Sequence, residues 1–155
     1  MPLSMRILPH RSLVIGSLRG RMTPADLRQS VRSFAEHPDF RPNLNRLVLA
    51  HSDVDVSESF LNNLFTIKED MIEHYFDGAI PNAESTPLYK TAIVTSSTGN
   101  EMITRLFQAV LDSDMPSVVA LQTFRDIHDA LAWLSLSETP LVDLEPELGH
   151  FLASA

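Results

Sequence analysis

The stretch that decides the fold is residues 117–134, which read SVVALQTFRDIHDALAWL. Residues 117–121 form a short apolar run in which valine is frequent, as is typical of a buried strand. Residues 123–134 then carry apolar side chains at the spacing of an amphipathic helix. A strand followed directly by such a helix, repeated along a chain, indicates a parallel sheet that is covered by helices.

Working outward, the same unit recurs towards the N-terminus, and the predicted order of elements is ββαβαβαβα. The first two strands flank a turn at 9–11, which predicts a hairpin. Helices are expected to begin near Thr23, near Ser57 and after Asn100, and the crossovers between parallel strands should be right-handed. The five predicted strands cover residues 3–8, 12–18, 46–50, 89–95 and 117–122.

Local signals support the helices and suggest a core. Thr23 is suited to capping the first helix, Pro24 to its first position, and Asp26 to the positive end of its dipole. Apolar side chains recur at helical spacing from Phe60 to Tyr75 and again in 102–111. We predict that one core buries Phe34, Val48, Ile93, Leu106, Val119 and Leu131 together.

Composition excludes several classes of function. The 155 residues have no cysteine, which rules out disulfides, thiolate catalysis and cysteine-ligated metals. A net charge of −8 disfavours nucleic acid as a partner, although arginines concentrate in the first third of the chain. No apolar run approaches the ~20 residues of a membrane span, and no signal peptide is evident, so we expect a cytoplasmic protein.

Three groups of residues resemble a known family in their order and spacing. They are Gly20-Arg21-Met22-Thr23 with Asp26-Leu27, then Glu36-His37-Pro38-Asp39-Phe40, then Phe124-Arg125-Asp126 with Asp129-Ala130-Leu131-Ala132-Trp133-Leu134. Over residues 3–135 the chain resembles the SpoIIAA-like fold of the STAS and Sec14-type group. It looks most like a branch of small, mostly uncharacterised single-domain bacterial proteins.

The resemblance implies an α/β domain over residues 1–136. Its sheet would be five-stranded and mixed, mostly parallel, and covered by about four helices. The acidic residues 137–155 would form a tail that could include a short helix. The resemblance also implies non-catalytic roles and no cofactor.

The resemblance further draws attention to the start of the second helix. In related anti-sigma-factor antagonists, phosphorylation of a serine at that position breaks a protein–protein contact. Ser57 occupies it here, but Val56 replaces the aspartate that usually comes directly before the serine. His51, Asp53, Asp55 and Ser57 are therefore the regulatory or interaction candidates.

Loops at the carboxyl ends of parallel strands are the usual place for a ligand, and here these loops are 51–57, 96–100 and 122–123. The polar turn Ser96-Ser97-Thr98-Gly99-Asn100 places hydroxyls and free N–H groups at a helix N-terminus, which suits an anion. It lacks the spacing and the lysine of a P-loop, and plain helix capping explains the same residues. His51, Asp53 and Asp55 could bind a divalent metal or could simply cap a turn, and we predict no metal.

No nucleophile–base pair or metal set is evident in the sequence. The favoured function is a non-catalytic module that binds a protein partner or a second copy of itself. The alternative is a carrier or sensor for a small anionic or lipid-like ligand, and the third is an enzyme of unknown type. A pocket lined by the second helix and the long loop at 77–88 would favour the carrier, whereas an exposed apolar patch around the second helix and the tail would favour protein interaction.

Overall fold

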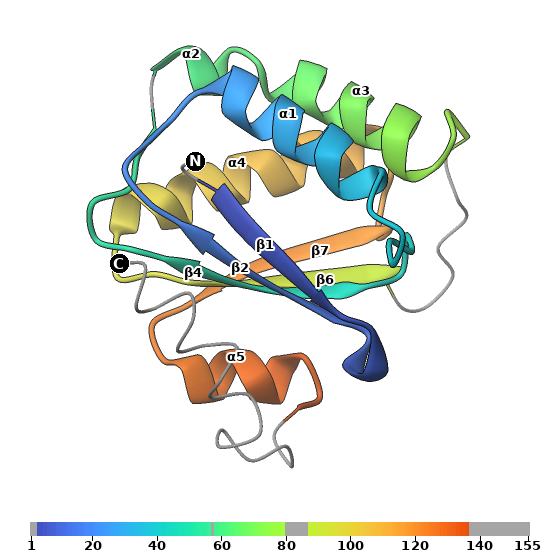
Figure 1. Ribbon diagram of the computed structural model, residues 1–155. Coiled ribbons are helices and arrows are strands. Elements are labelled where there is room, and N and C mark those ends of the chain that lie inside the picture. Colours follow the sequence, from blue (N-terminus) through green and yellow to red (C-terminus); the bar gives the residue numbers. More distant parts are fainter. Residues whose placement is uncertain (1–2, 57, 80–86, 137–155) are drawn as a thin grey trace.

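The computed structural model describes residues 3–56, 58–79 and 87–136, and it contains a mixed five-stranded sheet in the order β1-β2-β4-β6-β7 (Figure 1). β1 and β2 pair antiparallel as the predicted hairpin, and every later neighbour is parallel. The predicted fold class is therefore confirmed. The strands are β1 (Leu3–Leu8), β2 (Leu13–Leu18), β4 (Asn45–Ala50), β6 (Tyr89–Val94) and β7 (Val119–Phe124).

Helices cover both faces of the sheet, but unequally. Three long helices lie over one face, and one short helix lies under the other (Figure 1). The upper layer consists of α1 (Pro24–Ala35), α3 (Leu64–Tyr75) and α4 (Thr98–Asp114), and the lower helix is α5 (Ile127–Trp133). From β2 onwards, each new parallel strand is added next to the previous one in the same direction across the sheet. Because crossovers between parallel strands are right-handed, the three connecting helices all lie on one face.

This winding has a consequence for ligand binding. The parallel strands never reverse their order, so the sheet lacks the switch-point crevice in which doubly wound folds bind ligands. Space for a ligand must therefore lie between the sheet and one of its helix layers.

The first helix forms as its sequence predicts. Thr23 accepts a hydrogen bond from the Asp26 backbone N–H, and the Asp26 carboxylate accepts one from the Thr23 backbone N–H. This reciprocal capping box fixes where the helix begins. A small parallel sheet that was not predicted forms between β3 (Arg21–Met22), just before this helix, and β5 (Asp55–Val56).

Two helix predictions are wrong in detail. The predicted second helix is broken into α2 (Glu58–Leu61) and α3, because the two asparagines at 62–63 are poor helix formers. The last helix begins at Ile127 rather than at residue 123, because Thr123 and Phe124 extend β7 alongside β6. Asp126 is its N-cap and accepts a hydrogen bond from the His128 N–H.

The core prediction is also partly wrong. The sheet separates two apolar clusters, with Phe34 and Val119 on the α1–α3–α4 side and Leu131 on the α5 side. Val48 is buried, Ile93 is half-buried and Leu106 is 45% exposed. The six residues therefore do not form a single buried group.

Two predicted features cannot be compared with the structure. Ser57 and the tail at 137–155 lie outside the described residues. Within the described segments, every helix is too short or too polar to cross a lipid bilayer.

Candidate functional site

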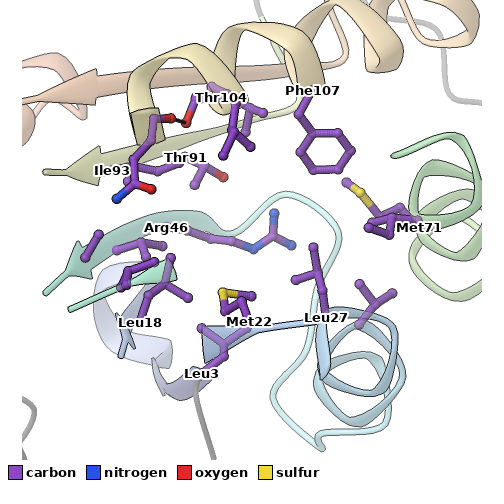
Figure 2. Close-up of a pocket in the computed structure, with 18 of the residues that line it drawn as sticks. Leu3, Leu18, Met22, Leu27, Arg46, Met71, Thr91, Ile93, Thr104 and Phe107 are labelled. Atoms are coloured by element: carbon purple, nitrogen blue, oxygen red, sulfur yellow. Dashed lines mark hydrogen bonds between the residues drawn. The ribbon is translucent and has the colours of Figure 1, made fainter. Parts of the chain in front are cut away.

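An apolar cavity of about 180 Å³ lies between the sheet and the α1–α3–α4 layer (Figure 2). Strand alternation supplies its floor, because every second residue of β4 and β6 faces the same side. These residues are Arg46, Val48 and Ala50 of β4, with Tyr89, Thr91 and Ile93 of β6. A pocket of this size that is lined by hydrocarbon can accept a small apolar molecule.

The roof of the cavity is α3, together with parts of α1 and α4. Ile67, Met71 and Tyr75 line it from α3, and Ile103 and Phe107 line it from α4. α3 packs mainly against the two neighbouring helices rather than against strands. This arrangement leaves room beneath the helix for a ligand.

Buried charges fasten α3 on both sides. The Asp70 carboxylate accepts a hydrogen bond from Arg28 Nε of α1 at 2.5 Å. The buried Lys68 Nζ lies 2.5 Å from the Asp114 carboxylate of α4 and also donates to Ser113 Oγ at 3.4 Å. Asp70 thus binds α1 on one side of α3, and Lys68 binds α4 on the other side. These two ion pairs hold α3, the roof of the cavity, in a defined position.

Arg46 is the one cation among the residues that line the cavity, and its side chain is directed into the space between sheet and helices (Figure 2). It is only 5% exposed. Its guanidinium carbon lies 3.9 Å from the ring centre of Tyr89, 5.0 Å from that of Phe34 and 5.1 Å from that of Tyr75. The three rings surround the charge with favourable π faces.

Hydrogen bonding at this position is incomplete. Nε and Nη2 of Arg46 and the hydroxyl of Tyr89 are buried without a hydrogen-bond partner. Among the described residues, no carboxylate forms an ion pair with Arg46. Their ion pairs join Arg28 and Arg32 to Asp70, Lys68 to Asp114, and Arg125 to Glu101. Buried polar groups in native proteins nearly always have partners, so this cluster needs an explanation.

Tyr75 stays a neutral phenol next to this charge. Burial raises the pKa of Tyr75 above its ordinary value of 10, and the neighbouring Arg46 opposes part of that rise. An ionised tyrosine therefore does not neutralise Arg46 near neutral pH.

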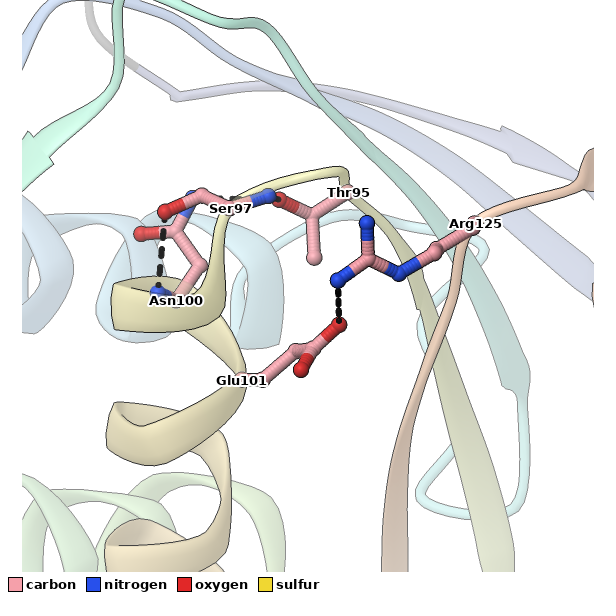
Figure 3. A network of polar contacts seen from close by, with 5 residues as sticks. All are labelled: Thr95, Ser97, Asn100, Glu101 and Arg125. Atoms are coloured by element: carbon pink, nitrogen blue, oxygen red, sulfur yellow. Dashed lines mark hydrogen bonds and ion pairs between the residues drawn. The ribbon is translucent and has the colours of Figure 1, made fainter.

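The anion-binding candidate at 96–100 forms an ordinary helix cap (Figure 3). Ser97 Oγ accepts from the Asn100 N–H at 3.2 Å, and Thr95 Oγ1 accepts from the Ser97 N–H at 3.1 Å. Ser96, Thr98 and Gly99 are not among the cavity residues, whereas Asn100 is. Beside the cap, Arg125 Nη2 lies 3.3 Å from a Glu101 carboxylate oxygen.

The structure does not gather the regulatory candidates into one group. His51 Nε2 lies 3.0 Å from Ser17 Oγ, on the α5 side of the sheet. Asp53 is exposed. Asp55 belongs to β5, where it lies opposite Arg21 of β3 in the strand register. Ser57 is outside the described residues, so its assignment stays a prediction.

The His51–Ser17 pair has the first link of a nucleophile–base arrangement. Ser17 is buried within β2, so a substrate cannot reach it in this conformation. Elsewhere, Asp70, Glu73 and His74 offer atoms within 4.8 Å of one another, and they are the one such group found in the described part of the chain. The charge of Asp70 is already used by Arg28, which weakens this group as a metal site.

Sequence reasoning missed Arg46 as a functional residue. The sequence did carry a signal for it. Residues 46–50 read RLVLA, and in a strand Arg46 points to the same face as Val48 and Ala50. A strand buried on both faces gives an arginine no route to water, so the arginine must have a buried role.

The comparisons with known proteins concern the fold. No protein-family model and no curated protein sequence matches the chain. One similar solved structure is described as an uncharacterised protein from the DUF3478 family with a SpoIIAA-like fold, from Shewanella loihica PV-4. It is 18% identical, the match covers 85% of this chain and 93% of that one, and the TM-score is 0.47.

Proposed function

We propose that the chain is a non-catalytic carrier or sensor that holds a small, largely apolar ligand beneath its helix layer. The observation that carries this proposal is the cavity of about 180 Å³ between the sheet and α3, with its almost entirely apolar lining. The pocket is open to the surface, so its lining exposes apolar area that would be favourable to cover. A concave, mostly apolar pocket of this kind is typical of a binding site for a small molecule.

The position of the cavity meets one part of the criterion set from the sequence. A pocket lined by the second predicted helix and the loop at 77–88 is expected to favour the carrier. α3 supplies Ile67, Met71 and Tyr75 to the lining, whereas the described residues of that loop are not among those that line the cavity. The enzyme alternative has weaker support, because the cavity has no nucleophile–base pair among its described residues.

Calorimetric titration with octan-1-ol, a neutral apolar probe, tests the proposal. Ala50 lines the cavity, so Ala50→Leu should fill part of it and weaken octanol binding by about tenfold. Ala132→Leu makes the same change at an exposed position of α5 and should leave the affinity unchanged. Absence of octanol binding to the wild type, or equal affinities for all three proteins, would refute the cavity as a binding site.

Protein interaction remains the second candidate, and one observation favours it. Four large apolar side chains are exposed on α2, α3 and α4, namely Leu61, Phe65, Met102 and Leu106. Exposed apolar side chains on one layer are typical of a contact surface. Self-association should then weaken in a Phe65→Ser/Met102→Ser double variant, measured by sedimentation equilibrium, and a monomeric wild type would exclude the homodimer.

A further inference from the structure

The position of Arg46 narrows the chemistry of the ligand. β4 is the central strand of the sheet, and Arg46 lies near its beginning, opposite Val14 of β2 and Thr91 of β6. Its side chain shares the cavity face with Val48 and Ala50. A charged group is thus built into the floor of a cavity that is otherwise almost wholly apolar.

The unpaired atoms of this arginine define a shape. Nε and Nη2 lie on one edge of the planar guanidinium, so their N–H bonds are parallel and serve two oxygens at once when the side chain turns this buried edge towards the cavity. The aromatic faces of Phe34, Tyr75 and Tyr89 attract the positive charge, but they leave these two donors without acceptors. The complementary group is planar and anionic and presents two oxygens, which describes a carboxylate.

Charge balance favours a group with a single negative charge. Arg46 is the sole cation in the described lining, and an uncompensated ion in such surroundings is strongly disfavoured. A carboxylate neutralises it. A phosphate monoester carries more charge, which the rest of the lining does not balance. The nearby Tyr89 hydroxyl, which is also unpaired, can donate a hydrogen bond to the same anion.

The rest of the lining describes the body of the ligand. From Arg46 to Ala50 the strand rises about 13 Å, at about 3.3 Å per residue. Val48, Ala50 and Ile93 line that path, and Leu18 continues it at the end of β2. The cavity volume is close to that of an engineered cavity which accepts benzene, so the body must be small, such as one aromatic ring or a single unbranched alkyl chain of up to about eight carbons.

We infer that the cavity binds a monocarboxylic acid with a compact apolar body, whose carboxylate pairs with Nε and Nη2 of Arg46. This inference rests on the proposed function and specifies its ligand class. The carboxylate lies at the deep end, against the aromatic rings, and the apolar body extends towards the carboxyl ends of β2, β4 and β6.

The test compares probes that differ only at the head group. Octanoate, octan-1-ol and octylamine are titrated into the wild type in the calorimeter, with inorganic phosphate as a separate arm. We expect octanoate to bind at least tenfold more tightly than octanol, which corresponds to about 1.4 kcal/mol. We expect octylamine to bind more weakly than octanol. Equal binding of octanoate and octanol, or preferential binding of phosphate, would overturn the inference while leaving the cavity as an apolar site.

Arg46→Met tests the residue itself, because methionine retains the apolar stem and removes the charge. The preference for octanoate over octanol should fall to about one, with octanol affinity kept within about threefold. Lys90→Met removes a half-buried cation that lies against Trp133 of α5 and does not line the cavity, and it should leave the preference intact. An unchanged preference in Arg46→Met would show that Arg46 only stabilises the aromatic cluster.

A measurement on the wild type covers the case in which Arg46→Met does not fold. The ¹⁵Nε resonance of Arg46, assigned by its loss in Arg46→Lys, should shift on addition of octanoate and not on addition of octanol. No shift at saturating octanoate would overturn the pairing. If neither octanoate nor octanol binds the wild type, the proposed function itself fails, and that result is distinct from failure of the carboxylate assignment.

Discussion

Arg28 of α1 and Asp70 of α3 form a 2.5 Å hydrogen-bonded ion pair that joins two helices of the layer above the cavity. The Asp70 side chain is 7% exposed, whereas that of Arg28 is 39% exposed. The acid therefore depends on its partner more than the base does. Arg32 also approaches Asp70, but its Nη2 stays 3.9 Å from the nearest carboxylate oxygen.

This difference predicts unequal effects for two arginines on one helix. Arg28→Met should lower the free energy of unfolding by about 1–3 kcal/mol, because it leaves a buried carboxylate without its main hydrogen-bond donor. Arg32→Met should lower it by less than about 0.5 kcal/mol, since the pair is long and exposed. Urea titration of both variants measures this, and equal losses would show that the short contact does not hold α3 to α1.

A second prediction compares two leucines of α4, Leu111 and the partly exposed Leu106, which the sequence predicted to be buried. Leu111 of the same helix is fully buried, so Leu111→Ala should lower the free energy of unfolding by about 2–5 kcal/mol. Leu106→Ala should lower it by much less, about 1 kcal/mol or below, because the residue is 45% exposed. A large loss for Leu106→Ala in the same urea titration would mean that an unseen contact covers it.

The strands of this fold were predictable, because their signal is local. In β1 and β2, alternation and the turn at 9–11 locate the hairpin, and the apolar run of β4 identifies a strand covered on both faces. The break at 62–63 was not predictable from spacing, since apolar side chains continue at helical intervals on both sides of it. Which side of α4 faces the sheet depends on where α3 lies, and for that reason Leu106 was wrongly predicted to be buried.

The candidate site was harder to predict, because it depends on how separate elements are stacked. The polar loops attracted attention through their residue types, yet the cavity is assembled from apolar positions on strands and helices distant in sequence. Arg46 alone was visible as an anomaly within a buried strand. Its three aromatic neighbours come from α1, α3 and β6, which no local pattern brings together.

A third prediction separates capping from ligand binding at the start of α4. Ser97→Ala should lower the free energy of unfolding by about 1 kcal/mol, because the Asn100 N–H loses its acceptor. Ser97→Asp keeps an acceptor there and should largely retain stability. Neither change should alter the affinity for octanoate, measured by calorimetry. Phosphate binding that is lost in both variants would instead support an anion site at 96–100.

The last prediction concerns alkaline pH and Tyr75. Burial raises the pKa of Tyr75 in the folded protein above the value of about 10 that an unfolded chain has. The folded state therefore retains this proton at a pH where the unfolded state releases it. The stabilisation is fully present below pH 10 and declines as the pH rises above it, by up to about 1.4 kcal/mol per pH unit.

Tyr75→Phe removes the titrating hydroxyl, so its free energy of unfolding should fall less steeply than that of the wild type between pH 10 and 11. Urea titrations across that range give both slopes, and because the difference between the proteins is compared, other titrating groups cancel. Identical slopes would mean that Tyr75 reaches water when it ionises, and hence that the layer above Arg46 opens readily.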